Sequence, residues 1–292
     1  MSKYILKVKN LNVYFKDKKI KDKKFKENKI KDKKNKYSKI IDNVSFSIKE
    51  GECLGILGES GSGKSITIKS ILGLLDNNFQ INGEALFYDK DLIKESSINM
   101  RKIRGKDICM ILQNPMTCFD PLYRIYNQME ETFAEHTNLN KENIYKKCIE
   151  TLEIMKIKNP KDTIKKYPHQ LSGGMLQRIM IGLALSLEPK LLVADEPTTA
   201  IDSISQSSIM EEFVRIKNEN KASMIFISHD LGILSKISDK MIVMKEGKIL
   251  ESGNVADIIF NGKDDYTNSL VSKRMAVMKK FNSIVYNTEI EA

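Results

Sequence analysis

The chain has 292 residues, of which 41% are hydrophobic and 29% charged, and a formal net charge of +10 at pH 7. This composition is that of an ordinary soluble globular protein with room for one large or two modest domains. Its longest apolar runs, such as residues 224–227, are far shorter than the roughly 20 residues that a membrane-spanning helix needs, which excludes a membrane-embedded subunit. The first ten residues contain no continuous apolar signal segment, which predicts a cytoplasmic protein.

Most of the positive charge lies in one segment near the N-terminus. Residues 16–39 contain 13 Lys and 4 acidic residues, so nine of the ten net positive charges lie there. The segment repeats every five residues, which matches neither the helical period of 3.6 nor the strand period of 2. A stretch this charged buries little apolar surface. We therefore expect a solvated Lys-rich insertion, and contact with an anionic membrane surface stays open as an alternative.

Strands are predicted on both sides of this insertion, at residues 6–15 and 40–52. Residues 53–75 then predict a short apolar strand, a glycine-rich turn and an amphipathic helix. Another apolar strand is expected at residues 107–113. Helical patterns separated by Asn and Pro occupy about residues 114–167, which predicts a helical subdomain.

The second half of the chain alternates between apolar runs and helical patterns. The runs at 190–195 and 223–230 are typical of buried parallel strands. Residues 240–253 predict a hairpin with Glu246 and Gly247 in its turn, followed by a helical tail. Strands that alternate with helices predict an α/β fold with a mostly parallel core sheet. The four cysteines (Cys53, Cys109, Cys118, Cys148) form no C-x-x-C pair and are expected to be buried free thiols rather than metal ligands.

The sequence GESGSGKS at residues 58–65 fits the pattern G-x-x-x-x-G-K-[ST], with a predicted strand before it and a helix after it. Glycines let successive backbone N–H groups point at a phosphate, Lys64 reaches the outer phosphates and the Ser65 hydroxyl binds Mg²⁺. The alternative is an ordinary glycine turn. Because the Lys and the Ser both stand in register, the pattern favours a nucleotide site.

Several polar residues follow the ends of predicted strands. Asp195 ends an apolar strand, where a carboxylate can contact a metal, and Glu196 can then aim a water molecule. Gln113 and His229 follow two other strands, and the carboxyl ends of parallel strands meet at one edge of the sheet. We expect Gln113 to sense the metal or the water and His229 to bond the terminal phosphate. Each is more often structural when taken alone, and only the nearby glycine-rich motif favours these roles.

A second anion site is predicted at LSGGMLQR, residues 171–178. Ser172, Gly173 and Gly174 precede a helix-forming run, and a helix N-terminus with small residues exposes backbone N–H groups to negative charge.

These motifs, together with TTAID at 198–202 and ISHD at 227–230, stand in the order of an ABC-type ATPase, which the chain resembles over residues 4–260. The resemblance implies a P-loop NTPase fold of ABC type, with an antiparallel β subdomain and a helical subdomain beside the mostly parallel core sheet. A helical tail would follow at 261–292. It also implies ATP and Mg²⁺ as cofactors and a head-to-tail dimer with a second ATPase subunit, itself or a paralogue.

The resemblance assigns roles residue by residue. Phe15 is expected to stack on adenine, with Tyr14 as the alternative on the other side of the strand. Ser172, Gly173 and Gly174 would contact the γ-phosphate bound by Lys64 of the second subunit, and Asp202 would lie in the loop linking the two sites. The implied catalytic residues are Glu196 and His229, and the metal ligands are Ser65, Gln113 and Asp195. The implied nucleotide contacts are Phe15, Gly58, Glu59, Ser60, Gly61, Ser62, Gly63, Lys64, Ser65, Ile66, Gln113, Ser172, Gly173, Gly174 and Asp202.

Finer detail resembles the peptide and nickel importer branch of this family. GESGSGKS, QNPMTCFDP, YPHQLSGGM and DDYTNSLV carry that resemblance, and LSGGMLQR, ADEPTTAID and the tail SLVSKRMAVMKKF are most similar to nickel-import ATPases. No cysteine follows Cys148, whereas peptide-transport members often have a C-terminal cysteine cluster. The three histidines (His136, His169, His229) stand singly, so no site for a metal cargo is predicted.

The resemblance implies a peripheral ATPase on the cytoplasmic face of the membrane that powers nickel import, as the ion or a chelate. Its partners would be two membrane permease subunits, whose coupling helix meets the segment after Gln113, and an extracytoplasmic substrate-binding protein. Import of di- or oligopeptides stays open. A soluble ABC ATPase acting on nucleic acid or ribosomes is less favoured, because the chain shows neither a second cassette nor a coiled-coil insertion, and no specific nucleic acid partner is expected.

Overall fold

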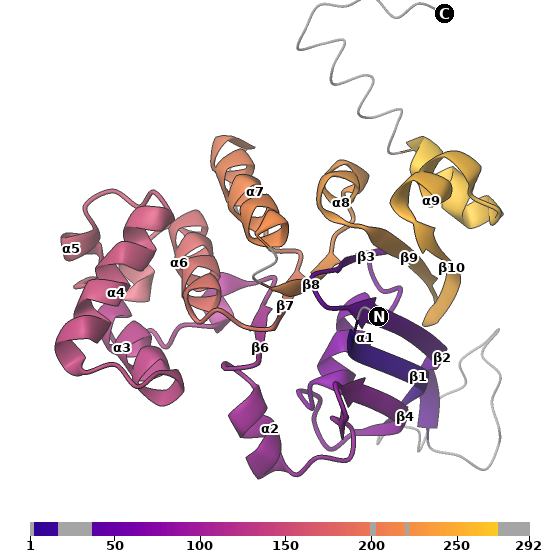
Figure 1. Ribbon diagram of the computed structural model, residues 1–292, viewed down its shortest axis with the longest axis horizontal. Helices are drawn as coiled ribbons and strands as arrows, with labels where there is room; N and C mark the ends of the chain where they lie inside the picture. The colour runs from indigo at the N-terminus through magenta and orange to yellow at the C-terminus, as the bar shows by residue number, and fades with distance from the viewer. Residues whose placement is uncertain (1–2, 17–36, 199–202, 220–221, 274–292) are drawn as a thin grey trace, which may run out of the picture. The chain divides into compact units, whose positions relative to one another are not determined.

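The computed structural model describes residues 3–16, 37–198, 203–219 and 222–273 (Figure 1). Two compact units are present and are described in turn: the first comprises residues 1–49, 56–100 and 241–292, and the second comprises 50–55 and 101–240. Asp202, residues 17–36 of the Lys-rich insertion and residues 274–292 of the tail lie outside the described residues. The predicted domain boundaries at 4–260 and 261–292 stay predictions.

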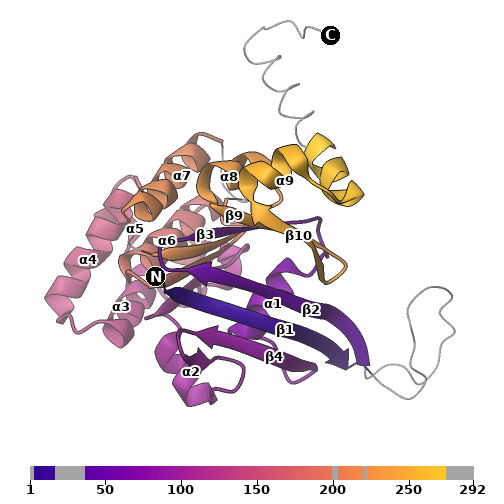
Figure 2. The same ribbon diagram turned by 45° about the vertical axis from the view of Figure 1, so that its right-hand side comes forward.

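An antiparallel sheet forms much of the first unit, with strand order β2-β1-β4-β5. Its strands are β1 (Tyr4–Lys16), β2 (Tyr37–Lys49), β4 (Phe79–Phe87) and β5 (Lys90–Asp91), and β1, β2 and β4 run side by side in Figure 2. Alternate apolar residues of β1 and β2, such as Val13 and Ile41, are fully buried, as one buried face requires. Both strands predicted around the Lys-rich insertion are confirmed, but with other bounds. Lys16 pairs with Tyr37, so Lys16 and residues 37–39, predicted to belong to the insertion, are instead paired strand residues.

Strand β4 was not predicted from the sequence, because Gly83 interrupts its pattern. Gly83 has φ +125°, and a Cβ there would lie 2.7 Å from the Asn10 carbonyl oxygen of β1. Opposite it, Asn10 takes φ 48° where the β1–β4 register shifts. The glycine is therefore required by the neighbouring strand rather than by a turn.

The remaining elements of the first unit surround the glycine-rich loop. Helix α1 (Lys64–Ile71) follows this loop, and strands β9 (Lys240–Lys245) and β10 (Lys248–Asn254) form the predicted hairpin. Its turn residues, Glu246 and Gly247, have φ 47° and 77°, as two-residue hairpin turns require. Helix α9 (Val255–Asn261) and a further helix over residues 265–273 follow.

Parallel strands form the centre of the second unit. Strands β6 (Ile108–Ile111), β7 (Leu191–Asp195) and β8 (Ser223–Ile227) pair in the order β8-β7-β6. Strand β3 (Cys53–Leu57) is divided between the units, and its start neighbours β8, where the Met224 N–H donates to the Glu52 carbonyl at 3.0 Å. Every residue of β7 and β8 is buried, which explains their continuous apolar sequences and confirms the predicted strands.

The helices expected at about 114–167 are present in the second unit. They are the 3-10 turn η1 (Pro115–Thr117), α3 (Ile125–His136), α4 (Lys141–Ile154) and the short α5 (Pro160–Thr163). Helix α3 buries Ile125, Met129 and Phe133, which share one helical face. The turn η2 (Pro168–Gln170) and helices α6 (Gly173–Ser186), α7 (Ser203–Asn218) and α8 (Leu231–Ile237) follow, while α2 (Ser97–Ile103) spans the boundary of the two units.

The cysteines are free, and three of the four are buried as expected. Burial raises the pKa of Cys53, Cys109 and Cys148 to about 12. Cys118 is exposed instead, because it lies just after η1 in a surface segment. Among the described residues, no group of His, Cys, Asp and Glu is suited to hold a metal ion, and none of their helices is long and apolar enough to cross a membrane.

Candidate active site

The glycine-rich loop of the first unit joins β3 to α1. Gly61 and Gly63 have φ +83° and +102°, which only glycine adopts readily. A Cβ on Gly61 would meet no atom within 4 Å, so this side of the loop is open. Helix α1 begins after Gly63 with neither a side-chain cap nor an acidic residue in its first turn. Its first N–H groups and the helix dipole therefore favour an anion.

Lys64 is buried inside this loop. Its Nζ donates to the carbonyl oxygens of Gly58 at 2.8 Å and Glu59 at 2.9 Å. A buried ammonium group needs such partners, so the backbone wraps around the side chain. The Ser62 hydroxyl is also buried and finds no hydrogen-bond partner among the described residues. An open glycine (Gly61), a cation and a hydroxyl without a described partner make a loop that fits phosphate oxygens.

Two segments of the first unit that are distant in the sequence contact the loop, and neither contact was predicted from the sequence. The Gly247 N–H donates to the Ser62 carbonyl at 2.9 Å, and a Cβ on Gly247 would overlap the Ile40 carbonyl oxygen. On another side, the Glu59 N–H donates to Tyr266 Oη at 3.3 Å. Burial raises the pKa of Tyr266, so its hydroxyl stays protonated at neutral pH. Only the tertiary fold brings these residues to the loop.

The two candidates for adenine stacking lie on opposite sides of β1. The Phe15 ring packs against Phe79 of β4, with ring centroids 5.1 Å apart and an interplanar angle of 56°. The Tyr14 ring lies 5.7 Å from Lys39 Nζ. Both tyrosine and phenylalanine are half-buried. Phe79 was missed by the sequence reasoning because its strand was missed.

Three strand ends of the second unit bring Gln113, Glu196 and His229 together. Glu196 Oε2 accepts a hydrogen bond from Gln113 Nε2 at 3.0 Å and lies 3.4 Å from His229 Nδ1. These residues follow β6, β7 and β8, so the prediction that they meet at one edge of the sheet is confirmed. The buried Asp195 ends β7 beside them.

Glu196 is held in an unusual backbone conformation. Its φ is 47°, and its N–H donates to the Ile227 carbonyl at 2.9 Å. Such a conformation costs a non-glycine residue about 1–3 kcal/mol and is concentrated at functional sites. Gln177 of α6 is buried and donates from Nε2 to the Pro197 carbonyl at 2.8 Å, which fixes the turn after Glu196. Gln177 was not singled out from the sequence, where it looked like an ordinary helical residue.

The N-terminus of α6 is open, as predicted. Ser172 is the N-cap, and its Oγ accepts from the Met175 N–H at 3.3 Å. A Cβ on Gly173 would meet no atom within 4 Å. The first turn of this 14-residue helix therefore presents backbone N–H groups to an approaching anion.

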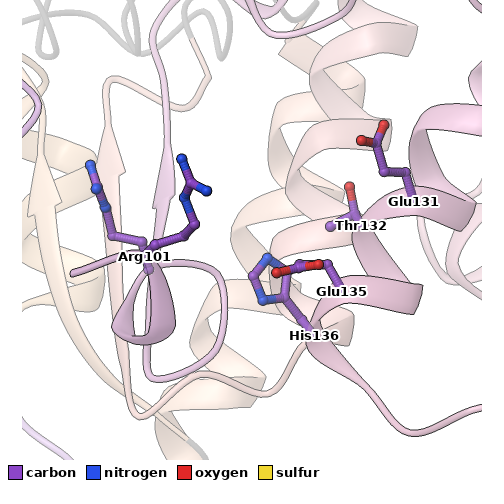
Figure 3. A pocket seen from close by; sticks show the side chains of 6 residues that line it. Arg101, Glu131, Thr132, Glu135 and His136 are labelled. Carbon is purple, nitrogen blue, oxygen red and sulfur yellow. The ribbon is translucent and has the colours of Figure 1, made fainter. Parts of the chain in front are cut away.

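A cavity of about 520 Å³ lies elsewhere in the second unit. Figure 3 shows Arg101 on one wall and the α3 side chains Glu131, Thr132, Glu135 and His136 on the other. Arg104 completes the lining. The cavity thus carries both positive and negative groups.

A glycine-rich phosphate loop, a carboxylate positioned at a strand end and an open helix N-terminus define a P-loop nucleotide hydrolase of the ATP-binding-cassette class. The sequence model of the family described as ABC transporter matches residues 41–199, and the chain belongs to this family of ATPases, whose ATP hydrolysis is coupled to transport.

Individual relatives agree with this assignment. The chain is 43% identical over 246 residues to the metal-staphylopine import system ATP-binding protein CntD of Staphylococcus aureus, covering 84% of this chain and 91% of that protein. It is 39% identical over 268 residues to the dipeptide transport ATP-binding protein DppD of Haemophilus influenzae, covering 91% and 76%. Its fold matches a dimeric post-hydrolysis structure of the ATP-binding cassette MJ0796 bound to ADP and Pi, with a TM-score of 0.71, 25% identity and coverage of 86% and 98%. The predicted fold class is therefore confirmed.

Proposed function

We propose that this chain is the ATPase subunit of an ABC importer for a metal chelate, with nickel as the expected metal. The observation that carries the proposal is its 43% identity to a metal-staphylopine import ATPase, of which it covers 91%. Import of di- or oligopeptides is the second candidate, supported by 39% identity over 91% of the chain to a dipeptide transport ATPase. The residues described above act on the nucleotide and not on the cargo, so cargo needs its own test.

The ATP-binding role is assigned first to the loop residues. The backbone N–H groups of residues 58–66 and the Lys64 ammonium bind the phosphates, which suits the open Gly61 and the uncapped α1. Phe15 stacks on adenine, which its half-exposed ring on β1 permits. Ser65, Gln113 and Asp195 bind Mg²⁺, since hydroxyl, amide and carboxylate oxygens are the donors it prefers. When bound, Mg²⁺ neutralises charge on the phosphate oxygens.

Glu196 is proposed to orient water for hydrolysis or to accept its proton. Gln113 and His229 support this role, because both lie at its Oε2 and limit where the carboxylate can point. His229 also hydrogen-bonds the terminal phosphate. A carboxylate in this place needs a fixed direction, since water must be aimed along one line.

We assign Ser172, Gly173 and Gly174 to the γ-phosphate of nucleotide bound by a second ATPase subunit, itself or a paralogue. The open α6 N-terminus supports this assignment, as does the likeness to a dimeric cassette. Asp202, outside the described residues, stays a predicted linker between the two sites. ATP then joins two subunits, and hydrolysis releases them.

The permease contact is assigned to the segment after Gln113 and to the charged cavity. Met116, Leu122 and Tyr123 are 52%, 79% and 55% exposed, which suits a docking surface. Arg101 and Glu131 of the cavity (Figure 3) would then meet a permease helix with groups of both charges. Two permease subunits, an extracytoplasmic binding protein and a peripheral place on the cytoplasmic face complete the proposed assembly.

Transport measurements in a deletion strain test the cargo assignment. Deleting the gene is expected to lower uptake of radioactive nickel, given as the ion or as a chelate, more than uptake of labelled di- and oligopeptides. Restoring the wild-type gene should restore uptake, and restoring the Glu196→Gln variant should not. Unchanged nickel uptake alongside lost peptide uptake would transfer the assignment to peptides.

A further inference from the structure

One peptide group of the nucleotide loop is bonded on both of its sides. The carbonyl oxygen of the peptide that joins Gly58 to Glu59 accepts from Lys64 Nζ at 2.8 Å. The N–H of the same peptide donates to Tyr266 Oη at 3.3 Å. Tyr266 lies 207 residues further along the chain, in the segment that follows α9. This peptide therefore links the Tyr266 hydroxyl to the buried Lys64 ammonium.

Tyr266 is itself fixed by its own segment. Asp264 Oδ1 accepts from the N–H groups of Tyr266 at 2.9 Å and Thr267 at 3.3 Å, at the start of the helix over residues 265–273. The Glu251 carboxylate of β10 accepts from the Lys263 N–H at 2.9 Å. These contacts hold the segment against the hairpin, so the hydroxyl has a defined position.

The ring of Tyr266 has a cationic neighbour. Lys245 Nζ lies 4.5 Å from the ring centroid, within the range of a cation–π contact. The ring also lines a hollow of about 410 Å³ together with residues of the β9–β10 turn and Asp264. Lys245 therefore fixes the ring by a cation–π contact, and Asp264 fixes the Tyr266 backbone by a hydrogen bond. Neither contact depends on the Tyr266 hydroxyl.

An amide whose N–H is hydrogen-bonded is a better acceptor at its carbonyl, and its plane is fixed. We propose that Tyr266 is a positioning residue for Lys64: its hydroxyl sets the Gly58–Glu59 peptide, and this peptide holds the Lys64 ammonium where it meets phosphate. The inference rests on the proposed function, in which Lys64 binds the nucleotide. Tyr266 itself needs no contact with ATP for this role.

The experiment is a double-mutant cycle on the purified full-length chain. The variants are Tyr266→Phe, Lys64→Ala and the double variant, and the measurement is ATP affinity in the presence of Mg²⁺. Tyr266→Phe keeps the ring and removes only the hydroxyl. We expect about fivefold weaker ATP binding, the effect of one ordinary hydrogen bond. In the Lys64→Ala background the same change is expected to have no further effect, because the group it positions is gone.

Tyr145→Phe is the matched control, since this tyrosine of α4 is 38% exposed and lies in the second unit. It should leave ATP affinity unchanged. A second measurement needs no nucleotide: amide hydrogen exchange at Glu59 should become faster in Tyr266→Phe and stay unchanged in Tyr145→Phe.

The possible results distinguish the positioning role of Tyr266 from the nucleotide-binding role of Lys64. Wild-type affinity in Tyr266→Phe, or an equal further loss when it is added to Lys64→Ala, would overturn the positioning role and show that Tyr266 only anchors its helix. Wild-type affinity in Lys64→Ala would instead overturn the nucleotide role of Lys64, and the inference with it. If Tyr266→Phe unfolds at a lower temperature, the double-mutant cycle still distinguishes the two roles. A general loss of stability would weaken ATP binding by the same further factor in the Lys64→Ala background, whereas a loss of Lys64 positioning would not.

Discussion

Two helix N-termini in the described part of the chain are suited to bind phosphate, and they are built in opposite ways. The N-terminus of α1 follows a loop that is held by Lys64, by Gly247 of the hairpin and by Tyr266. The N-terminus of α6 is capped only by Ser172, and Gly173 faces open space. A site that is held on several sides is preorganised to bind ligand within its own chain. An open one is suited to a ligand that arrives on another molecule.

The largest effect is expected from Glu196→Gln, which leaves both phosphate sites intact. Hydrolysis should fall by about 10²–10⁴-fold, because the amide cannot accept a proton from water. ATP affinity should stay within about twofold, since Gln keeps the shape of Glu. Steady-state turnover and nucleotide titration on the same preparation measure both. Hydrolysis at the wild-type rate would mean that Glu196 is only a turn residue.

The next effect concerns the loop before α1. Lys64→Ala should weaken ATP binding about tenfold to a hundredfold, since hydrogen bonds to charged groups contribute roughly 1.5–3 kcal/mol. Lys69→Ala, in the last turn of the same helix, is the control and should bind as wild type. Calorimetric titration with ATP distinguishes them. Equal losses in both variants would indicate a general charge effect rather than a specific contact.

Glycine substitutions test the difference between the two sites without nucleotide. Gly247→Ala should lower the unfolding temperature by about 5–10 °C, because the new Cβ overlaps the Ile40 carbonyl at φ +77°. Gly173→Ala should change it by about 1 °C or less, since its Cβ meets open space. Thermal unfolding of both variants checks this. Equal shifts would contradict the contrast between a supported loop and an open helix end.

The smallest effect is expected from a change in the Lys-rich insertion. Replacing residues 17–36 by a short Gly/Ser turn should keep at least about half of the ATPase activity, because Lys16 and Tyr37 are already paired in β1 and β2. Binding of the subunit to anionic vesicles should fall, with the salt-sensitive part lost. Equal vesicle binding at low salt would leave the insertion as a solvated connection.

The features of the fold and the site that could be predicted from the sequence are those set by residues close together in the chain. The loop, the α6 N-terminus and the strands of the second unit follow from glycine spacing, capping chemistry and continuous apolar runs. The proximity of Gln113, Glu196 and His229 could be predicted because the carboxyl ends of parallel strands meet at one edge of the sheet. The hairpin turn at Glu246 and Gly247 was likewise local.

The features that could not be predicted from the sequence depend on tertiary contacts. Strand β4 carries Gly83 because Asn10 of β1 lies against it, and that neighbour is more than 70 residues away. Tyr266 and Gln177 look like ordinary helical residues until their partners, Glu59 and Pro197, are known. Cys118 is exposed because of the surface path after β6, which composition does not reveal.

In the proposed dimer, the open end of α6 acts on nucleotide bound by another subunit. The variant Ser172→Arg tests this role, because the bulky cation fills the open space at the N-terminus of α6 and leaves the residues of the loop before α1 unchanged. ATP affinity of the isolated subunit and ATP turnover of the assembled transporter should be measured on the same variant. We expect wild-type ATP affinity and a turnover reduced to half of the wild-type rate or less. Wild-type affinity together with wild-type turnover would contradict a shared site.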